Sequence, residues 1–314
     1  MKRFALIGAA GYVAPRHMRA IRDTGNQLVA VLDPYDGIGV MDEFFPDADF
    51  FTEPERFDRH LDKLRRIPGQ RMDYVSICSP NYLHDAHIRM TLRNEADAIC
   101  EKPLVLNPWN VDALEHLETE TGRKINVILQ LRLHPSVLSL KEKVEAEGPE
   151  RWHEVELTYV TARGKWYQRS WKGDEEKSGG IATNIGIHFF DMLTWIFGPH
   201  QSTGLHHRDA FTMSGVSLLK NARVRWLLSV DARFLPADVQ SEGKRSFREL
   251  KLDGETFKFS DGFSNLHTDS YQHILRGEGF GPADARESIR MVHAMRSLSI
   301  SKPGEHTHPG YIKI

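Results

Sequence analysis

Two basic side chains, Lys102 and His188, stand in surroundings that suit proton transfer. Lys102 is the middle residue of Glu101-Lys102-Pro103, which ends a short apolar run that begins at Asp97. His188 is one of the few polar residues in an apolar stretch from 184 to 197. An imidazole changes charge near neutral pH, and a lysine amine can hydrogen-bond a reacting oxygen. Together they would suit acid–base chemistry on a hydroxyl group, although a surface lysine and a buried core histidine are the simpler alternatives.

A second set of residues is typical of a dinucleotide site. The apolar run Phe4–Ile7 is followed by Gly8-Ala-Ala10-Gly11-Tyr12-Val-Ala14, and the next apolar run ends on Asp33. Glycines at a strand-to-helix turn let the backbone approach a pyrophosphate, and an acid further on can bond a ribose hydroxyl. Residues 34–40 contain no lysine or arginine for a 2′-phosphate, so NAD is favoured over NADP. The expected cofactor contacts are Gly8, Ala10, Gly11, Tyr12 and Asp33.

The apolar pattern along the chain predicts the elements that would position these residues. Continuous apolar strands at 4–7, 28–33, 73–78, 97–105 and 125–129 alternate with helices, including one at 53–66 in an otherwise irregular region from 41 to 71. Such strands are typical of a parallel sheet that binds ligands at its carboxyl edge. In the strands at 153–159 and 224–230 apolar and polar residues alternate, which indicates a half-exposed, mostly antiparallel sheet. We expect an NAD-binding α/β Rossmann domain over 1–131, then an α+β domain with an open-faced sheet over 132–314 for substrate binding and oligomerisation.

His188 falls on a predicted helix that ends at Gly198, and the last helix is expected at 283–301. At 100° per residue, Asn184, His188, Asp191 and Trp195 share about 60° of arc, and apolar residues fill nearly all the rest. An almost wholly apolar helix is buried, so its polar stripe must be paired or face a cavity. We favour a cavity. An acid one turn after the histidine favours catalysis over a core role.

The segment from 161 to 180 combines cations with large aromatic side chains. Five basic residues, at 163, 165, 169, 172 and 177, are interleaved with Trp166, Tyr167 and Trp171. Cations for phosphates or carboxylates and aromatics for a ring would suit an anionic sugar nucleotide. A solvated loop neutralised by the acids at 174–176 is the alternative. The chain carries 41 basic and 43 acidic residues, and this near-neutral balance argues against a nucleic-acid or membrane partner.

Composition and length agree with an intracellular enzyme of two domains. The 314 residues exceed one ordinary core, and no stretch approaches the ~20 apolar residues that span a bilayer. Two cysteines, Cys78 and Cys100, do not make a disulfide scaffold and show no metal-ligand spacing, so we expect reduced thiols and no metal. The expected location is the cytoplasm.

Three motifs resemble those of the glucose-fructose oxidoreductase/inositol dehydrogenase superfamily. They are Glu101-Lys102-Pro103, Ser79-Pro-Asn81-x-x-His84 and Asn184-x-Gly-x-His188-x-x-Asp191. The resemblance implies that Lys102 lies beside the nicotinamide and acts with His188, and that Ser79, Asn81, His84, Glu101, Lys102 and Gln130 also contact the cofactor. Asn184 stands where the superfamily motif has an aspartate, so one possible acid or base is missing.

Further motifs resemble the bacterial UDP-N-acetyl-glucosaminuronate 3-dehydrogenases of lipopolysaccharide O-antigen synthesis, over essentially the whole chain. Among them are Arg163-Gly-x-Trp166-Tyr167, Ser170-Trp-Lys172-Gly-Asp and Lys177-Ser178-Gly-Gly. The resemblance implies NAD-dependent oxidation of the sugar 3-hydroxyl to a ketone. The implied substrate contacts are Arg163, Trp166, Tyr167, Lys172, Ser178, Asn184 and His188.

Some points stay open at this stage. Either Lys102 or His188 can be the formal base, and NADH is either released or recycled in place by 2-oxoglutarate, as in some relatives. A homotetramer is expected by family analogy and from the open sheet. A dehydrogenase for another sugar or an inositol is the nearer alternative function. An NAD-binding sensor without turnover is the alternative from another class.

Overall fold

The structure is a computed structural model that describes residues 1–257 and 265–313. These residues form two compact units. The first contains residues 1–130 and 265–286, and the second contains residues 131–257 and 287–313. The sequence analysis assigns residues 265–286 to the second domain, whereas in the structure they pack within the first unit.

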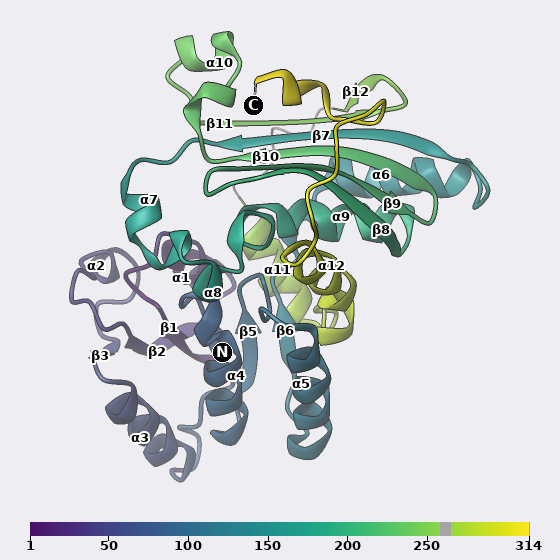
Figure 1. The fold of residues 1–314 in the computed structure, drawn as a ribbon. Coiled ribbons are helices and arrows are strands. Elements are labelled where there is room, and N and C mark those ends of the chain that lie inside the picture. The colour runs from purple at the N-terminus through teal and green to yellow at the C-terminus, as the bar shows by residue number, and fades with distance from the viewer. Residues whose placement is uncertain (258–264, 314) are drawn as a thin grey trace. The chain divides into compact units, whose positions relative to one another are not determined.

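The first unit is built on a six-stranded parallel sheet with the order β3-β2-β1-β4-β5-β6 (Figure 1). The strands are β1 (Arg3–Ile7), β2 (Gln27–Leu32), β3 (Asp49–Phe51), β4 (Tyr74–Ile77), β5 (Asp97–Cys100) and β6 (Ile125–Val127). Its helices are α1 (Ala14–Asp23), α2 (Met41–Phe44), α3 (Pro54–Arg65), α4 (His84–Arg93), α5 (Pro108–Thr121) and α11 (Leu266–Leu275). The strand order reverses between β1 and β4, and open α/β sheets bind ligands at such a switch point. The predicted Rossmann fold is confirmed.

Helix α11 belongs to the first unit because its apolar side chains complete that unit's core. Tyr271 and Ile274 are buried in one hydrophobic cluster with Met18 and Ile21 of α1 and Phe4 of β1. Burying such side chains stabilises a fold by about 1.5–3 kcal/mol each, which favours keeping α11 against α1. The short elements α2 and β3 lie in the region 41–71 that the sequence analysis described as irregular.

The second unit contains a mixed sheet with the order β12-β11-β7-β10-β9-β8. Its strands are β7 (His153–Thr161), β8 (His200–Arg208), β9 (Thr212–Leu219), β10 (Ala222–Ser229), β11 (Ser246–Leu252) and β12 (Glu255–Phe257). Within this sheet, β7 and β10 pair in parallel, and the other neighbouring strands pair antiparallel. The helices are α6 (Pro135–Ala146), α7 (Trp166–Arg169), α8 (Glu175–Ser178), α9 (Ile187–Phe197), α10 (Ala237–Ser241) and α12 (Pro282–Met295), the last of which begins in the first unit.

The two faces of this sheet have different surroundings. Phe189 and Phe190 of α9 pack on Tyr159 and Trp226, with ring centroids 4.7 and 5.4 Å apart. Side chains alternate across a strand, so Thr158 points to the opposite face, where its hydroxyl lies 3.1 Å from His308 Nε2. The C-terminal segment, yellow in Figure 1, therefore runs over part of the face that the sequence analysis left open.

The last helix ends earlier than predicted. Helix α12 stops at Met295 instead of 301, and Ile300 then forms a parallel bridge with Leu205 of β8. Arg208 Nη1 donates to the carbonyl oxygens of Met295 and Arg296 at 3.2 and 2.6 Å, which supplies the final turn with a cation and with donors. After a turn at 296–297, the chain around Ile300 and Ser301 thus runs beside β8.

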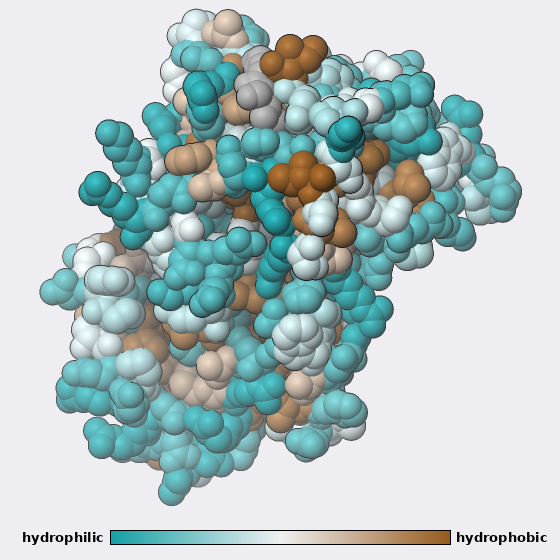
Figure 2. All heavy atoms as spheres, viewed as in Figure 1, coloured by the Kyte–Doolittle hydropathy of each residue, from teal (hydrophilic) through white to brown (hydrophobic). Residues whose placement is uncertain are grey.

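The surface carries mixed polarity. On the face drawn in Figure 2, hydrophilic side chains predominate and apolar ones form small separate groups. Among the described residues, no helix combines the length and the apolar character that crossing a membrane requires.

Candidate active site

The glycine turn after β1 is shaped by close backbone contact. Gly8 has φ +90°, and a Cβ at this residue would lie 2.7 Å from the carbonyl carbon and oxygen of Cys78. A Cβ at Gly11 would lie 3.0 Å from the Gly8 carbonyl oxygen. Helix α1 starts directly afterwards, and its N-cap residue Val13 makes no side-chain capping hydrogen bond. A narrow cradle and an uncapped helix N-terminus are what a pyrophosphate needs.

Asp33 connects the end of β2 to this cradle. Its Oδ2 accepts the N–H of Ala10 at 2.8 Å, and its Oδ1 accepts the N–H of Tyr35 at 2.9 Å. Each carboxylate oxygen keeps a second lone pair, so both can still accept a hydrogen bond from a ribose hydroxyl. Tyr12 is exposed and lies beside Arg16, with the guanidinium 5.7 Å from the ring centroid. Gln130 at the end of this unit is buried, and its Oε1 accepts no hydrogen bond from the described residues.

The loops after β4 and β5 are tied together by a histidine. His84 is buried, with Nδ1 2.7 Å from the Pro103 carbonyl and Nε2 2.9 Å from the Ser79 carbonyl. Burial lowers its pKa despite the contacts with the two carbonyls, so the ring is neutral and donates to one of them. Ser79 Oγ also lies 2.8 Å from His87 Nδ1, and Asn81 is buried in the same loop. Because His84 contacts backbone on both sides, its position suits holding the loops in place.

Glu101, directly before Lys102, is buried among polar partners that the sequence analysis missed. Its Oε1 lies 3.0 Å from His17 Nε2 and 2.9 Å from His267 Nε2. His17 comes from α1 and His267 from α11, so no local motif joins these residues. Only the return of residues 265–286 to the first unit brings them together. Lys102 itself is partly buried.

Two residues of the polar stripe of α9, Asp191 and Asn184, are paired within the second unit, and the cavity expected along the stripe stays a prediction. Asp191 accepts hydrogen bonds from Arg132 Nε and Nη2 at 3.0 and 2.8 Å, and both side chains are buried. Asn184 Nδ2 donates to the Tyr167 hydroxyl at 2.6 Å. His188 is partly buried between these two pairs along the helix. Neither Arg132 nor Tyr167 was predicted as a partner of this stripe.

A π-helical turn at Ala182–Gly186 leads into α9. A Cβ at Gly186 would lie 2.5 Å from Leu228 Cδ1, so glycine lets this turn press against β10. Single π turns recur at functional sites because they shift the following side chains around the helix axis.

The predicted substrate residues between 163 and 178 divide into exposed and buried ones. Arg163 and Trp166 are exposed, and Lys172 Nζ lies 3.8 Å from the centre of the Trp171 ring. Tyr167 is buried, which raises the pKa of its hydroxyl. Ser178 is also buried, and its Oγ donates to the Asp174 carbonyl at 2.8 Å. Tyr167 and Ser178 therefore shape the loop.

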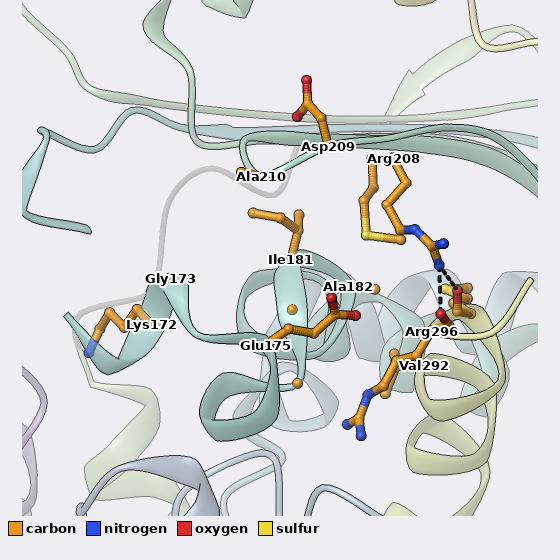
Figure 3. Close-up of a pocket in the computed structure, with 14 residues that line it drawn as sticks. Lys172, Gly173, Glu175, Ile181, Ala182, Arg208, Asp209, Ala210, Val292 and Arg296 are labelled. Carbon is orange, nitrogen blue, oxygen red and sulfur yellow. Dashed lines mark hydrogen bonds between the residues drawn. The ribbon is translucent and has the colours of Figure 1, made fainter. Parts of the chain in front are cut away.

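One cavity of about 320 Å³ lies within the second unit, between the segment 172–182, the β8–β9 turn and the end of α12 (Figure 3). Its lining includes Lys172, Glu175, Arg208, Asp209 and Arg296. In Figure 3 the Lys172 amine points away from the other lining side chains. The lining of the cavity carries both cations and acids, so its charge does not favour binding of an anion. Arg208 and Arg296 belong to no motif, and sequence reasoning missed them.

Two family models cover most of the chain. Residues 2–129 match the GFO/IDH/MocA oxidoreductase family, NAD-binding Rossmann fold, and residues 141–224 match the C-terminal α/β domain of the same family. The chain belongs to this oxidoreductase family. The predicted superfamily and the NAD cofactor are thereby confirmed, and the glycine cradle, Asp33 and Gln130 described above fit that cofactor.

Within the family, two solved structures are similar over nearly the whole chain. The WlbA (WbpB) dehydrogenase from Thermus thermophilus, crystallised with NAD and alpha-ketoglutarate, is 52% identical with a TM-score of 0.94. That match covers 98% of this chain and 99% of the other. The same enzyme in complex with NAD and UDP-GlcNAcA is 51% identical over the same shares, also with a TM-score of 0.94.

Curated relatives are more distant. The D-glucoside 3-dehydrogenase of Escherichia coli is 27% identical over 62% of this chain. This chain spans 34%, 54% and 55% of the lengths of the first three curated relatives that it matches.

Proposed function

We propose that this protein oxidises the 3-hydroxyl of UDP-N-acetyl-glucosaminuronic acid (UDP-GlcNAcA) to a ketone with NAD, in O-antigen sugar synthesis. One observation carries the proposal: the 51% identity, over 98% of this chain, to an enzyme crystallised with NAD and UDP-GlcNAcA. Lys102 and His188 stand at the matching motif positions. A protein that had kept this fold only to sense NAD would need neither Lys102 nor His188 for catalysis.

Each candidate catalytic residue has a definite task. When bound, NAD supplies the acceptor for the hydride that leaves the sugar carbon. His188 takes the hydroxyl proton, because a neutral imidazole is available as a base near pH 7. Lys102 hydrogen-bonds the same oxygen and favours the negative charge that develops on it. The reverse assignment, with Lys102 as the base, uses the same two groups.

The first experiment measures formation of reduced nicotinamide by absorbance. Purified protein is mixed with NAD and UDP-GlcNAcA, and in parallel with UDP-N-acetylglucosamine, a D-glucoside and an inositol. We expect turnover with the uronate and little with the others. Turnover with an uncharged sugar alone would reject the substrate assignment, and NAD binding without turnover on any sugar would favour a sensor.

Substitution then tests the two roles. Lys102→Ala and His188→Ala should each lower kcat by about 10²–10⁴-fold, the usual range for a general acid or base. Affinity for NAD, measured by calorimetry, should stay within a few-fold. Lys63→Ala, at an exposed position on α3, is the matched control and should change neither quantity. Equal loss of NAD binding and turnover would give Lys102 or His188 a structural role instead.

We further propose a division of labour between the units. The first binds NAD through the residues around Gly8, Asp33 and Ser79. The second binds the sugar nucleotide, with Arg163, Trp166 and Lys172 as direct contacts. Arg163→Ala should therefore raise KM for UDP-GlcNAcA and leave the Kd of NAD unchanged. The opposite result would move Arg163 out of the substrate site.

Recycling of NADH by 2-oxoglutarate is proposed for the same site. Its support is the crystallisation of the 52% identical Thermus enzyme with NAD and alpha-ketoglutarate. Protein that carries NADH after one turnover should lose the reduced-nicotinamide absorbance when 2-oxoglutarate is added, and 2-hydroxyglutarate should form. Persistent absorbance together with release of NADH on gel filtration would indicate an ordinary dissociating cofactor.

A homotetramer is proposed from family analogy and the large second sheet. The outer face of that sheet carries charge, since Arg225 and Lys251 pair with Glu156 at 3.3 and 3.1 Å. A contact there would have to complement these pairs. Light scattering that gives the mass of one chain would contradict the tetramer.

A further inference from the structure

The turn that carries Lys102 is surrounded by three buried histidines from three different helices. His17 of α1, His84 of α4 and His267 of α11 are 0%, 1% and 4% exposed. His17 and His267 contact the Glu101 carboxylate before the lysine, and His84 contacts the Pro103 carbonyl after it. Glu101 Oε2 also accepts the backbone N–H of Lys102 at 3.2 Å. Buried rings thus contact the side chain of the residue before the lysine and the backbone of the residue after it.

The hydrogen bonds around Glu101 have only one consistent direction when the carboxylate is ionised. Both Nε2–H groups donate to Oε1, because an ionised carboxylate only accepts. His17 Nδ1 then accepts the Tyr271 hydroxyl at 2.8 Å, and the Tyr271 oxygen accepts the Ser76 hydroxyl at 2.5 Å. Every polar atom along this path, from β4 through α11 and α1 to the lysine turn, therefore has a partner.

The electrostatics agree with this direction. Burial by itself raises the pKa of Glu101, but the hydrogen bonds from His17 and His267 outweigh it and hold that pKa well below its ordinary value. Burial lowers the pKa of His17, against the opposing effect of Glu101. Glu101 is therefore charged and His17 neutral at pH 7.

His17, Glu101 and His267 form a His-Glu-His set that could in principle hold a metal ion. Their spacing fits hydrogen bonds better. The two Nε2 atoms lie 3.0 and 2.9 Å from Oε1, whereas ligands of tetrahedral zinc, bound at about 2.0–2.1 Å, lie about 3.3 Å apart. A metal would also need both Nε2 atoms without their protons.

We propose that His17, His84 and His267 are positioning residues for Lys102, and that they act by holding Glu101 and Pro103 on either side of it. The proposal rests on the function proposed above. A misplacement of about 1 Å can cost about 10²-fold in rate, so small movements of this turn would be visible in kcat. NAD is also held by the glycine cradle and Asp33, away from this turn, so its affinity should change little.

The test compares two substitutions at one residue. His267→Leu removes the donor to Glu101, whereas His267→Gln keeps an amide N–H at nearly the same place. We expect His267→Leu to lower kcat about 10–100-fold with the Kd of NAD within twofold, and His267→Gln to recover most of that loss. His153→Leu is the control, because His153 is also buried and lies 3.0 Å from a carboxylate, Asp253, in the other unit. It should reduce stability without changing the kcat of the folded enzyme.

A second measurement does not depend on turnover. Long-range ¹H–¹⁵N spectra of histidine-labelled protein should show His17 as the neutral Nε2–H tautomer, with its signals shifted in Glu101→Gln. An unchanged kcat in His267→Leu, an Nδ1–H tautomer of His17, or one equivalent of metal that is lost in His267→Leu would each overturn the proposal. If the wild-type protein does not oxidise UDP-GlcNAcA, the proposed function fails, and the tautomers still decide whether the histidine arrangement exists.

Discussion

The buried ion pair between Arg132 and Asp191 tests whether α9, the helix that carries His188, depends on a charge pair for its stability. The two side chains are 6% and 3% exposed, and two hydrogen bonds of 3.0 and 2.8 Å join them. The Arg132 guanidinium also lies 5.7 Å from the centre of the Trp195 ring, one turn further along α9. Asp191 in turn lies one helical turn after His188.

The expected magnitude follows from what is left behind when one partner is removed. Asp191→Asn leaves the arginine charge buried without its counter-charge, and Arg132→Met does the same to the carboxylate. Breaking a buried pair in this way costs about 3–5 kcal/mol, whereas replacing both partners by apolar residues of similar volume is often neutral. The double variant Arg132→Met/Asp191→Leu should therefore be destabilised much less than the sum of the single variants Arg132→Met and Asp191→Leu.

Urea unfolding followed by tryptophan fluorescence and far-UV circular dichroism measures these free energies. If the two units unfold in separate steps, the shift should appear in the step of the second unit. Arg151→Ala is the control in that unit, because Arg151 is exposed and its pairs with Glu147 and Asp253 are long, at 3.7 and 3.6 Å. Exposed pairs contribute about 0–1 kcal/mol, so Arg151→Ala should change stability little.

Two results would refute this reasoning. A cost below about 1 kcal/mol for Asp191→Asn would mean that the pair behaves as a solvated one. Additive single and double variants would mean that the two charges are not coupled. Folded Asp191→Asn protein should also turn over more slowly while binding NAD normally, since α9 carries His188.

Three further predictions concern the first unit. Gly8→Ala should abolish NAD binding in a titration, because the added Cβ would lie 2.7 Å from the Cys78 carbonyl and φ is +90°. Asp33→Asn should weaken NAD binding about 10–100-fold, the loss expected for a hydrogen bond to a charged acceptor, and calorimetry would measure it. Burial lowers the pKa of His87 to about 4. Above pH 6.5 neither the folded nor the unfolded chain binds the proton, so no stability is lost there. As the pH falls from 6.5 to 4, the unfolded chain binds the proton first, which favours unfolding. The free energy of unfolding, measured with urea, should therefore fall over that range by up to about 3 kcal/mol, and less in His87→Gln.

The parts of the fold that could be predicted from the sequence are those set by local patterns. Strands β1, β2, β4 and β5 are continuous apolar runs, and Gly8 and Asp33 close the first two of them, so their order and ligand edge followed directly. Helix α12 was predicted to run to residue 301 but ends at Met295, and the alternation of Leu298 and Ile300 with serines suits an extended segment. The pairing of Ile300 with Leu205, which decides between the two, is a long-range contact.

The partners of the candidate site residues could not be predicted, and for the same reason. The helical arc placed His188 and Asp191 on one side of α9, but Arg132 and Tyr167, which satisfy the polar neighbours, come from separate segments. A polar residue on an apolar helix requires a partner, and the sequence does not say which residue provides it.

Different interactions hold Lys102 and His188 in place, so substitutions of the neighbouring residues should have different effects at the two sites. The lysine turn is held by several hydrogen bonds to one carboxylate and one carbonyl, so losing a single donor leaves the others in place. The helix of His188 depends on an ion pair in which losing either member leaves a buried charge. Substitutions around Lys102 should therefore reduce turnover in graded steps while the protein stays folded. Substitutions at Arg132 or Asp191 should instead reduce the amount of folded protein first, and a comparison of kcat with stability across both sets would separate the two kinds of support.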